Sequence, residues 1–201
     1  MKLYFSPGAC SLAPHIIMRE IGLDIELVKV DLHTKITEDG DDFFAVSPLG
    51  RVPALQINPQ NTLTESVAVL QYLSDQNPDK KLAPENGTLA RARLQEILNF
   101  LTSDLHPAFG PLFAPSSDSD KQKAVEKIEL KFNHINTFLA GKTFLIEDTF
   151  SIADAYLYAI ASWTFPTGLG MDKWPNLATF FGRVSERSSV MAAMQAEGLT
   201  G

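Results

Sequence analysis

Residues 1–30, MKLYFSPGACSLAPHIIMREIGLDIELVKV, decide how the chain begins to fold. The short runs Lys2–Phe5 and Glu26–Val30 each predict a strand. Between them, apolar residues recur at the spacing of a helix: Ala13, Ile16, Ile17 and Ile21. This stretch therefore predicts a strand–helix–strand (βαβ) unit.

A second unit follows before residue 78. The runs Pro53–Ile57 and Thr62–Thr64 predict two strands separated by a turn of Asn and Pro residues. A helix with an apolar face comes next, formed by Val69, Tyr72 and Leu73. A βαβ unit followed by a ββα unit is the outline of an α/β thioredoxin-like domain with a mixed sheet. We expect this domain to span residues 1–77.

The rest of the chain predicts an all-helical domain. Residues 78–87 are polar and contain two prolines, which predicts a linker, and residues 88–201 have the period of helices. Two apolar stripes predict long helices: Leu94, Ile97, Leu98, Leu101 and Leu105, and then Val125, Ile128, Phe132, Ile135 and Leu139. Ser151 and Asp154 have capping-box spacing, so Asp154 is expected to cap a buried helix. A last long helix is expected to begin near Pro175.

The composition limits the partners and the compartment. With 17 Lys and Arg against 24 Asp and Glu, the net charge of −7 offers no basic surface for nucleic acid or an anionic membrane. No apolar run reaches the length of a membrane span, and the N-terminus lacks the apolar segment of a secretory signal. The single cysteine, Cys10, excludes an internal disulfide and favours a reducing compartment. We therefore expect a cytoplasmic protein.

Cys10 lies at a position where reactive thiols are found. Proline is tolerated only in the first turn of a helix, so Pro14 places the helix start near Cys10. The dipole and the unpaired N–H groups at a helix start stabilise a thiolate. A lone cysteine is also commonly a small buried apolar residue, and the two interpretations are about equally supported. Without a second cysteine, any disulfide must form with a small thiol or with another protein.

Two further places in this domain could hold a ligand. A cis Val52–Pro53 bond would suit a thioredoxin-like fold by exposing the Val52 backbone, although a trans bond is far commoner in general. At the next helix start, N–H groups beside Ser66 could bind a carboxylate and Glu65 could hold an ammonium. The pair suits the amino-acid end of a ligand, and plain helix capping by Ser66 is the simpler alternative.

Polar side chains also recur in the helical part. Asn99, Ser103 and His106 fall at i, i+4 and i+7, opposite the first leucine stripe. Such a stripe is usually only solvated, but Pro107 disturbs the helix near Ser103 and frees a carbonyl for a ligand or water. The remaining histidines form no ligand-like group, so we expect no metal site. The sequence has no GxGxxG, Walker-type or GxSxG motif.

Four stretches of the chain together resemble the glutathione transferases, and specifically the bacterial beta class. They are MKLYFSPGACSLAPHI at 1–16, GDDFFAVSPLGRVPAL at 40–55, LTESVAVLQYL at 63–73 and SIADAYLYAI at 151–160. The resemblance implies the glutathione transferase fold, with a thioredoxin-like domain that binds glutathione and an all-helical domain. It also implies a homodimer.

The resemblance gives each candidate residue a role. Cys10 would lie beside the glutathione sulfur and could form a mixed disulfide with it, with Tyr4 and Ser11 secondary. The other contacts would be Lys35 at the glycyl carboxylate, Val52 before cis Pro53 at the cysteinyl backbone, Glu65 and Ser66 at the γ-glutamyl end, Asn99, Ser103 and His106 at the thiol, and Asp104 at the ligand of the partner subunit. The chain departs from the family pattern at Arg51 and Pro107.

These roles predict a glutathione S-transferase, in which the glutathione thiolate attacks small hydrophobic electrophiles in detoxification. Cys10 and His106 would be its catalytic residues. Candidate residues for the electrophile pocket are Phe109, Phe113, Trp163 and Phe165, which core packing would also explain. The alternative is glutathione-dependent thiol–disulfide exchange through a Cys10 mixed disulfide. A non-catalytic ligand-binding protein is the third possibility.

Overall fold

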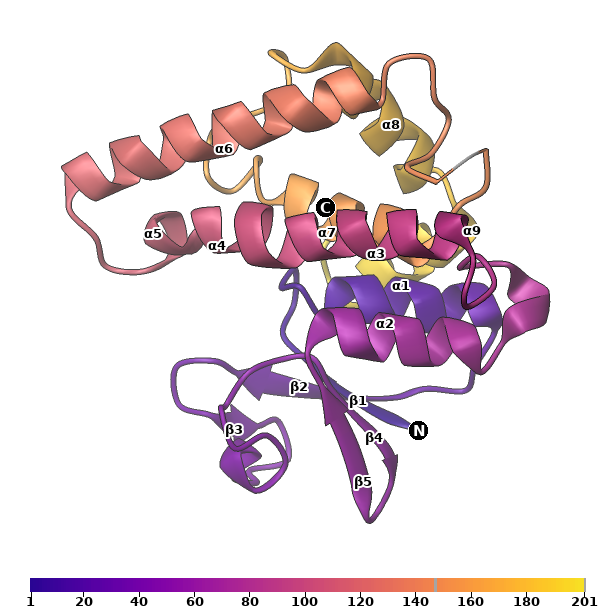
Figure 1. Cartoon of the computed structure of the whole chain (residues 1–201). Helices are drawn as coiled ribbons and strands as arrows, with labels where there is room; N and C mark the ends of the chain where they lie inside the picture. Colours follow the sequence, from indigo (N-terminus) through magenta and orange to yellow (C-terminus); the bar gives the residue numbers. More distant parts are fainter. Residues whose placement is uncertain (147, 201) are drawn as a thin grey trace. The chain divides into compact units, whose positions relative to one another are not determined.

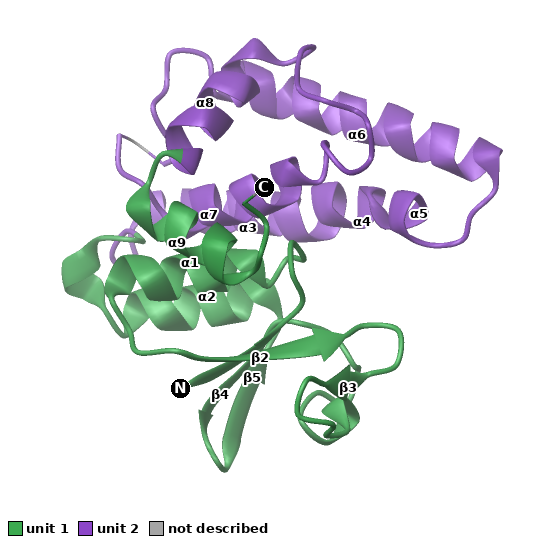
Figure 2. Ribbon diagram, turned by 180° about the vertical axis from the view of Figure 1, so that it is seen from behind, with its two compact units in different colours: residues 1–83, 186–201 green, residues 84–185 purple. Residues whose placement is uncertain are grey.

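A computed structural model of the chain describes residues 1–146 and 148–200 (Figure 1). They divide into two compact units, residues 1–83 with 186–201 and residues 84–185 (Figure 2). The expected domains, 1–77 and 88–201, differ from these units at the C-terminal end. The difference arises from α9 (Ser188–Ala196), a helix not predicted from the sequence, which packs against α1 (Leu12–Ile21) of the first unit.

The first unit contains a five-stranded mixed sheet in the order β3-β2-β1-β4-β5. Its strands are β1 (Lys2–Phe5), β2 (Glu26–Asp31), β3 (Ile36–Thr37), β4 (Ala54–Asn58) and β5 (Asn61–Thr64). β1 pairs in parallel with β2 and antiparallel with β4, which confirms the predicted βαβ and ββα units. β4 begins one residue later than predicted, because Pro53 has no N–H to donate to a ladder. The two-residue strand β3 was not predicted.

Helices α1 and α2 (Ser66–Asp75) lie side by side against the sheet (Figure 1). Pro14 sits in the first turn of α1, as expected, and the helix ends at Gly22, whose φ of 83° is left-handed. Fully buried Leu3, Ile16 and Leu55 contribute to the core from β1, α1 and β4. Two short 3₁₀ turns, η1 (Phe43–Ala45) and η2 (Pro78–Lys80), complete the first unit.

The second unit is helical throughout its described regular elements. These are α3 (Leu89–Phe100), a π-turn η3 (Leu101–Leu105), α4 (His106–Ala108), α5 (Gly110–Phe113), α6 (Asp118–Phe138), α7 (Ile152–Ser162) and α8 (Pro175–Ser185). The first predicted stripe is fully buried except at Ile97, which is half-buried. In α6, Ala124 takes the buried place expected for Val125, which is half-buried.

The helix α7 begins with the predicted capping box. Asp154 accepts hydrogen bonds from the backbone N–H and the hydroxyl of Ser151, at 2.8 and 2.6 Å, and from the N–H of Leu145 at 2.8 Å. The helix behind it is almost entirely buried, as expected. The helix that begins at Pro175 is not the last one, because α9 follows it. Among the described residues, no helix is both long enough and apolar enough to cross a membrane.

Candidate functional site

The thiol of Cys10 faces the backbone just ahead of Pro53. Cys10 lies between β1 and α1, and its Sγ donates a hydrogen bond to the Val52 carbonyl at 3.3 Å. The Val52–Pro53 peptide bond is cis, as expected for this fold, and Val52 is buried. The folding of the first unit thus brings residue 10 onto residue 52.

The surroundings of Cys10 distinguish between the two interpretations of this residue. Burial raises the pKa of the thiol above its ordinary value, and this effect exceeds the lowering by a hydrogen bond from Ser66 and by nearby backbone groups. The carboxylate of Glu65 also raises the pKa. Of the two interpretations of Cys10, these effects favour the buried, neutral thiol, because desolvation outweighs the helix start. At neutral pH Cys10 is a neutral thiol that donates to Val52.

Glu65 and Ser66 begin α2 beside this thiol. Glu65 occupies the N-cap position, contrary to the capping role expected for Ser66, and makes no capping hydrogen bond with its side chain. Its backbone has a φ of 68°, a left-handed value that is costly for a residue other than glycine. The side chain of Glu65 is exposed, whereas Ser66 is buried and its side chain is hydrogen-bonded to Cys10. Strained backbone of this kind clusters at ligand-binding sites.

Lys35 contacts the segment that precedes Val52. Its Nζ donates to the Gly50 carbonyl at 2.9 Å, two residues before Val52, and its own φ is 61°. Of the secondary hydroxyl groups, Ser11 is fully buried and bonded to the backbone of Ser6. Tyr4 packs on Phe43, with ring centroids 5.6 Å apart. The first unit therefore brings together Cys10, Val52, Ser66 and Glu65, and Lys35 is hydrogen-bonded to Gly50, two residues before Val52.

Asn99, Ser103 and His106, which were expected to share one helix face, lie in different surroundings. Asn99 and Ser103 are exposed and bond the backbone one turn back, at 2.9 Å to the Gln95 carbonyl and 2.7 Å to the Asn99 carbonyl. The disturbance expected near Ser103 takes the form of the π-turn Leu101–Leu105. A π-turn has more residues per turn than an α-helix, so the seven-residue spacing no longer returns His106 to the face of Asn99. The expectation of a single shared face is therefore wrong.

His106 instead lies against buried aromatic side chains. Its Nδ1 is 2.8 Å from the Tyr156 hydroxyl, and its ring meets the Trp163 ring edge-on with centroids 4.8 Å apart. Burial lowers the pKa of His106, so the ring is neutral at pH 7. Tyr156 was not singled out from the sequence, because an apolar helix gives no signal for one polar partner.

Three of the four candidate pocket aromatics pack together, and one of them, Trp163, contacts His106. Phe109, Phe113 and Trp163 have ring centroids 5.4 to 6.3 Å apart. Phe109 and Trp163 are buried, and Phe113 is 54% exposed. Phe165 packs on Phe181 instead, with centroids 5.5 Å apart.

Asp104 forms an ion pair within its own chain. Its Oδ1 lies 3.0 Å from Nζ of Lys131 on α6, and this contact lowers the pKa of the Asp104 carboxyl. The side chain of Asp104 remains half exposed, at 51%. Lys131 was not predicted, since 27 residues separate the pair.

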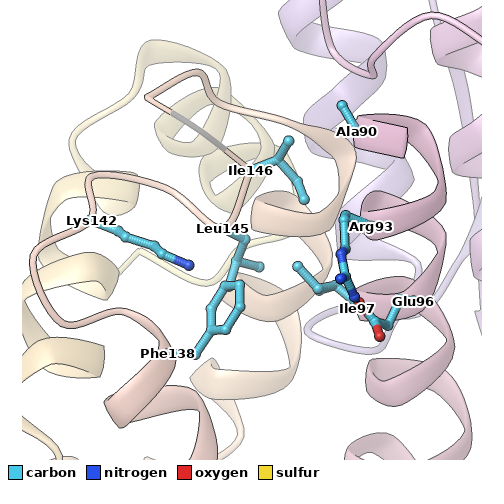
Figure 3. A pocket seen from close by; sticks show the side chains of 8 residues that line it. All are labelled: Ala90, Arg93, Glu96, Ile97, Phe138, Lys142, Leu145 and Ile146. Carbon is cyan, nitrogen blue, oxygen red and sulfur yellow. Dashed lines mark hydrogen bonds and ion pairs between the residues drawn. The ribbon is translucent and has the colours of Figure 1, made fainter. Parts of the chain in front are cut away.

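A pocket of about 350 Å³ lies elsewhere on the second unit (Figure 3). It is lined by Ala90, Arg93, Glu96, Ile97, Phe138, Lys142, Leu145 and Ile146. Arg93 bonds Glu96 at 2.7 Å, and Nζ of Lys142 lies 3.3 Å from the centre of the Phe138 ring. None of the predicted site residues lines this pocket. No group of three or more His, Cys, Asp or Glu side chains able to hold a metal occurs among the described residues.

Comparison with known proteins gives a consistent result. Residues 1–75 match the family model "Glutathione S-transferase, N-terminal domain", and residues 62–188 match "Glutathione S-transferase, C-terminal domain". The chain is 42% identical over 200 residues to glutathione S-transferase GstA of Escherichia coli O157:H7, covering 99% of this chain and 100% of the relative.

Two solved structures are similar along their whole length. One is a sphingomonad glutathione S-transferase complexed with glutathione, with 48% identity, a TM-score of 0.95 and complete coverage of both chains. The other is a bacterial beta class glutathione S-transferase of Sphingomonas chungbukensis, with 48% identity, a TM-score of 0.97 and complete coverage of both chains.

Proposed function

The chain belongs to the glutathione S-transferase family and to its bacterial beta class, and from this premise we propose that it joins glutathione to small hydrophobic electrophiles. The glutathione thiol loses its proton, its sulfur forms a bond to an electrophilic carbon, and the leaving group departs with its bonding electrons. Glutathione is a co-substrate in this reaction. The setting we propose is the cytoplasm.

The observation that carries the proposal is the neutral thiol of Cys10 beside the Val52 carbonyl. A neutral thiol is a poor nucleophile but a hydrogen-bond donor. The nucleophile is then the sulfur of glutathione, and when glutathione binds, the single S–H of Cys10 would turn from the Val52 carbonyl to that sulfur. This role favours conjugation over a reaction that begins with attack by Cys10.

The first unit offers groups that match the rest of glutathione. We assign the γ-glutamyl end to Glu65, which is exposed, and to Ser66 at the start of α2. The Val52 backbone is assigned to the cysteinyl backbone and the ammonium of Lys35 to the glycyl carboxylate. Binding glutathione in this way would replace the bond from Lys35 to the Gly50 carbonyl.

The second unit is assigned to the thiol and the electrophile. His106 would act at the glutathione sulfur, whereas Asn99 and Ser103, which the π-turn separates from His106, are no longer included. Phe109, Phe113 and Trp163 would receive the electrophile, because their rings pack together and Trp163 contacts His106, whereas Phe165 is no longer included. Asp104 would reach the glutathione of the partner subunit in a homodimer. A light-scattering mass near 22.1 kDa, that of one chain, would contradict the dimer.

Thiol–disulfide exchange remains the second candidate function, because Cys10 is the only cysteine and lies at the proposed thiol site. Cys10 would attack a glutathione mixed disulfide and a second glutathione would release it. The raised pKa of Cys10 opposes this reaction, since only the thiolate attacks.

The test compares two activities of the wild-type protein. Glutathione-dependent conjugation of a chloronitrobenzene and glutathione-dependent reduction of a small dialkyl disulfide are measured in parallel. We expect conjugation to be the faster reaction relative to its uncatalysed rate. Disulfide reduction without conjugation would make the second candidate the main function. Binding of glutathione with neither activity would indicate a ligand-binding protein.

A further inference from the structure

His106 is held from the protein interior by two hydroxyl groups. Its Nδ1 lies 2.8 Å from the hydroxyl of Tyr156, a fully buried residue of α7. The Tyr156 hydroxyl in turn donates to Oγ1 of Thr102 at 3.3 Å. The three side chains therefore form a continuous chain of hydrogen bonds that ends at the imidazole.

The π-turn brings Thr102 and His106 to Tyr156 together. The backbone N–H of His106 donates to the Leu101 carbonyl, five residues back, and the turn packs against α7. On the imidazole, the Trp163 ring adds an edge-on contact at an interplanar angle of 67°. The orientation of the ring is therefore fixed by backbone, hydrogen bond and packing at once. Single π-turns inside helices are frequent at functional sites.

Counting protons decides which nitrogen of His106 is protonated. The Tyr156 hydroxyl has one proton, and it gives this proton to Thr102. When the Tyr156 hydroxyl donates to Thr102 in this way, the hydrogen between Tyr156 and His106 comes from Nδ1. The ring is neutral at pH 7, so a proton on Nδ1 leaves Nε2 without one. Among the described residues, Nε2 has no hydrogen-bond partner, and it is an acceptor.

We propose that Tyr156, oriented by Thr102, is a positioning residue that fixes His106 with its proton on Nδ1, so that Nε2 accepts the proton of the glutathione thiol. This inference rests on the proposed function, in which His106 meets that thiol. The S–H bond breaks and its proton moves to Nε2, leaving the electron pair on sulfur for the new C–S bond. After the leaving group departs, His106 returns the proton to water. An orienting group behind a histidine is a general device for fixing its tautomer.

The variant Tyr156→Phe removes one hydroxyl and keeps the ring. We expect kcat for conjugation to fall about tenfold or more, with KM for glutathione unchanged, because general-base catalysis contributes factors of this size. Tyr158→Phe is the matched control. Tyr158 is buried in the same helix, two residues on, and stacks on Phe181 with centroids 4.5 Å apart, away from His106. Its substitution should leave kcat unchanged.

A purely structural role for Tyr156 would not set the tautomer, so the tautomer is measured directly. Imidazole ¹⁵N chemical shifts distinguish a proton on Nδ1 from one on Nε2, and a His106→Gln variant identifies the resonances of His106. We expect the Nδ1–H form in wild type and in Tyr158→Phe, and a change toward the Nε2–H form in Tyr156→Phe. This measurement needs no turnover.

Thr102 supplies a second test at a site that is not fully buried. Thr102→Val removes the acceptor, so the Tyr156 proton turns to Nδ1 and the tautomer changes. Thr102→Ser keeps the hydroxyl and should restore wild-type kcat and ¹⁵N shifts. Unchanged tautomer and kcat in both Tyr156→Phe and Thr102→Val would overturn the inference. A wild-type protein without conjugation would contradict the proposed function instead, and the ¹⁵N shifts tell the two failures apart.

Discussion

His15 and Glu197 form a fully buried pair, with Nδ1 of the histidine 2.9 Å from Oε1 of the carboxylate, although 182 residues separate them. The second oxygen of Glu197 accepts the backbone N–H of Gly8 at 2.9 Å, two residues before Cys10. Nε of Arg19 donates to the other nitrogen of His15 at 3.3 Å, so Nδ1 carries the proton given to Glu197. Glu197, which follows α9, is thereby hydrogen-bonded both to α1 and to the segment that precedes Cys10.

Glu197→Ala should strongly destabilise the protein. It leaves the buried His15 ring without this acceptor and removes a hydrogen bond from the Gly8 N–H, and a hydrogen bond to a charged group contributes about 1.5–3 kcal/mol to the free energy of unfolding. Urea unfolding measures this loss. Glu186→Ala, which removes an exposed carboxylate a short distance earlier in the chain, is the control and should change the free energy by less than about 0.5 kcal/mol. Equal effects of the two variants would contradict the account of the buried pair.

The alkylation rate of Cys10 should respond in opposite directions to its two neighbours. Because its pKa is raised, iodoacetamide should react with Cys10 at pH 7.5 more slowly than with free cysteine. Ser66→Ala removes a bond that lowers the pKa, so alkylation should slow further. Glu65→Gln removes a charge that raises the pKa, so alkylation should quicken. Changes of the same sign in both variants would contradict this electrostatic account.

Glutathione binding should depend on the carboxylate of Glu65. Glu65→Gln should raise KM for glutathione about tenfold, because a hydrogen bond to a charged group contributes about 1.5–3 kcal/mol. Steady-state kinetics with varied glutathione measure this effect. Glu85→Gln neutralises another exposed carboxylate, outside the proposed site, and should leave KM unchanged. An unaltered KM in Glu65→Gln would remove Glu65 from the site.

The buried carboxyl of Asp154 should make stability depend on pH. Burial raises its pKa from 3.8 to about 6, despite the hydrogen bonds that it accepts. The folded protein then binds more protons than the unfolded chain between these values, so the stability contribution of Asp154 falls as pH rises through this window.

This dependence is measured as the difference in free energy of unfolding between wild type and Asp154→Asn. A change of about two pKa units corresponds to about 3 kcal/mol. From pH 4 to pH 7, wild type should therefore lose up to that amount of stability relative to Asp154→Asn. If wild type instead gained stability relative to Asp154→Asn over this range, the folded state would lower the pKa of Asp154.

Local patterns in the sequence were sufficient for most of the fold. The alternation and spacing of apolar residues predicted β1, α1 and β2, and Pro14 alone fixed the start of α1. The capping box at Ser151 and Asp154 was predicted for the same reason, since both partners lie within one turn. Elements that depend on distant contacts were missed: α9 is held to α1 by pairs such as His15 with Glu197.

The candidate site was predicted less completely. The family resemblance implied that Cys10 and Val52 both meet glutathione, but it implied neither their direct hydrogen bond nor the protonation of Cys10, because burial cannot be inferred from the neighbours of Cys10 in the sequence. The π-turn moved His106 away from Asn99, since helical spacing assumes an unbroken α-helix. The contacts of Tyr156 with His106 and of Lys131 with Asp104 were not predicted, because the partners lie on helices that are distant in the sequence.

The central claim is that glutathione supplies the nucleophilic sulfur while Cys10 remains a thiol donor. Comparing wild type and Cys10→Ala tests it most directly, with conjugation of a chloronitrobenzene and reduction of a dialkyl disulfide measured on the same preparations. The account predicts that Cys10→Ala retains conjugation at a reduced rate, because it loses a hydrogen-bond donor, and loses all disulfide reduction. Complete loss of conjugation in Cys10→Ala would contradict the account, because Cys10 would then be indispensable and not only an auxiliary donor.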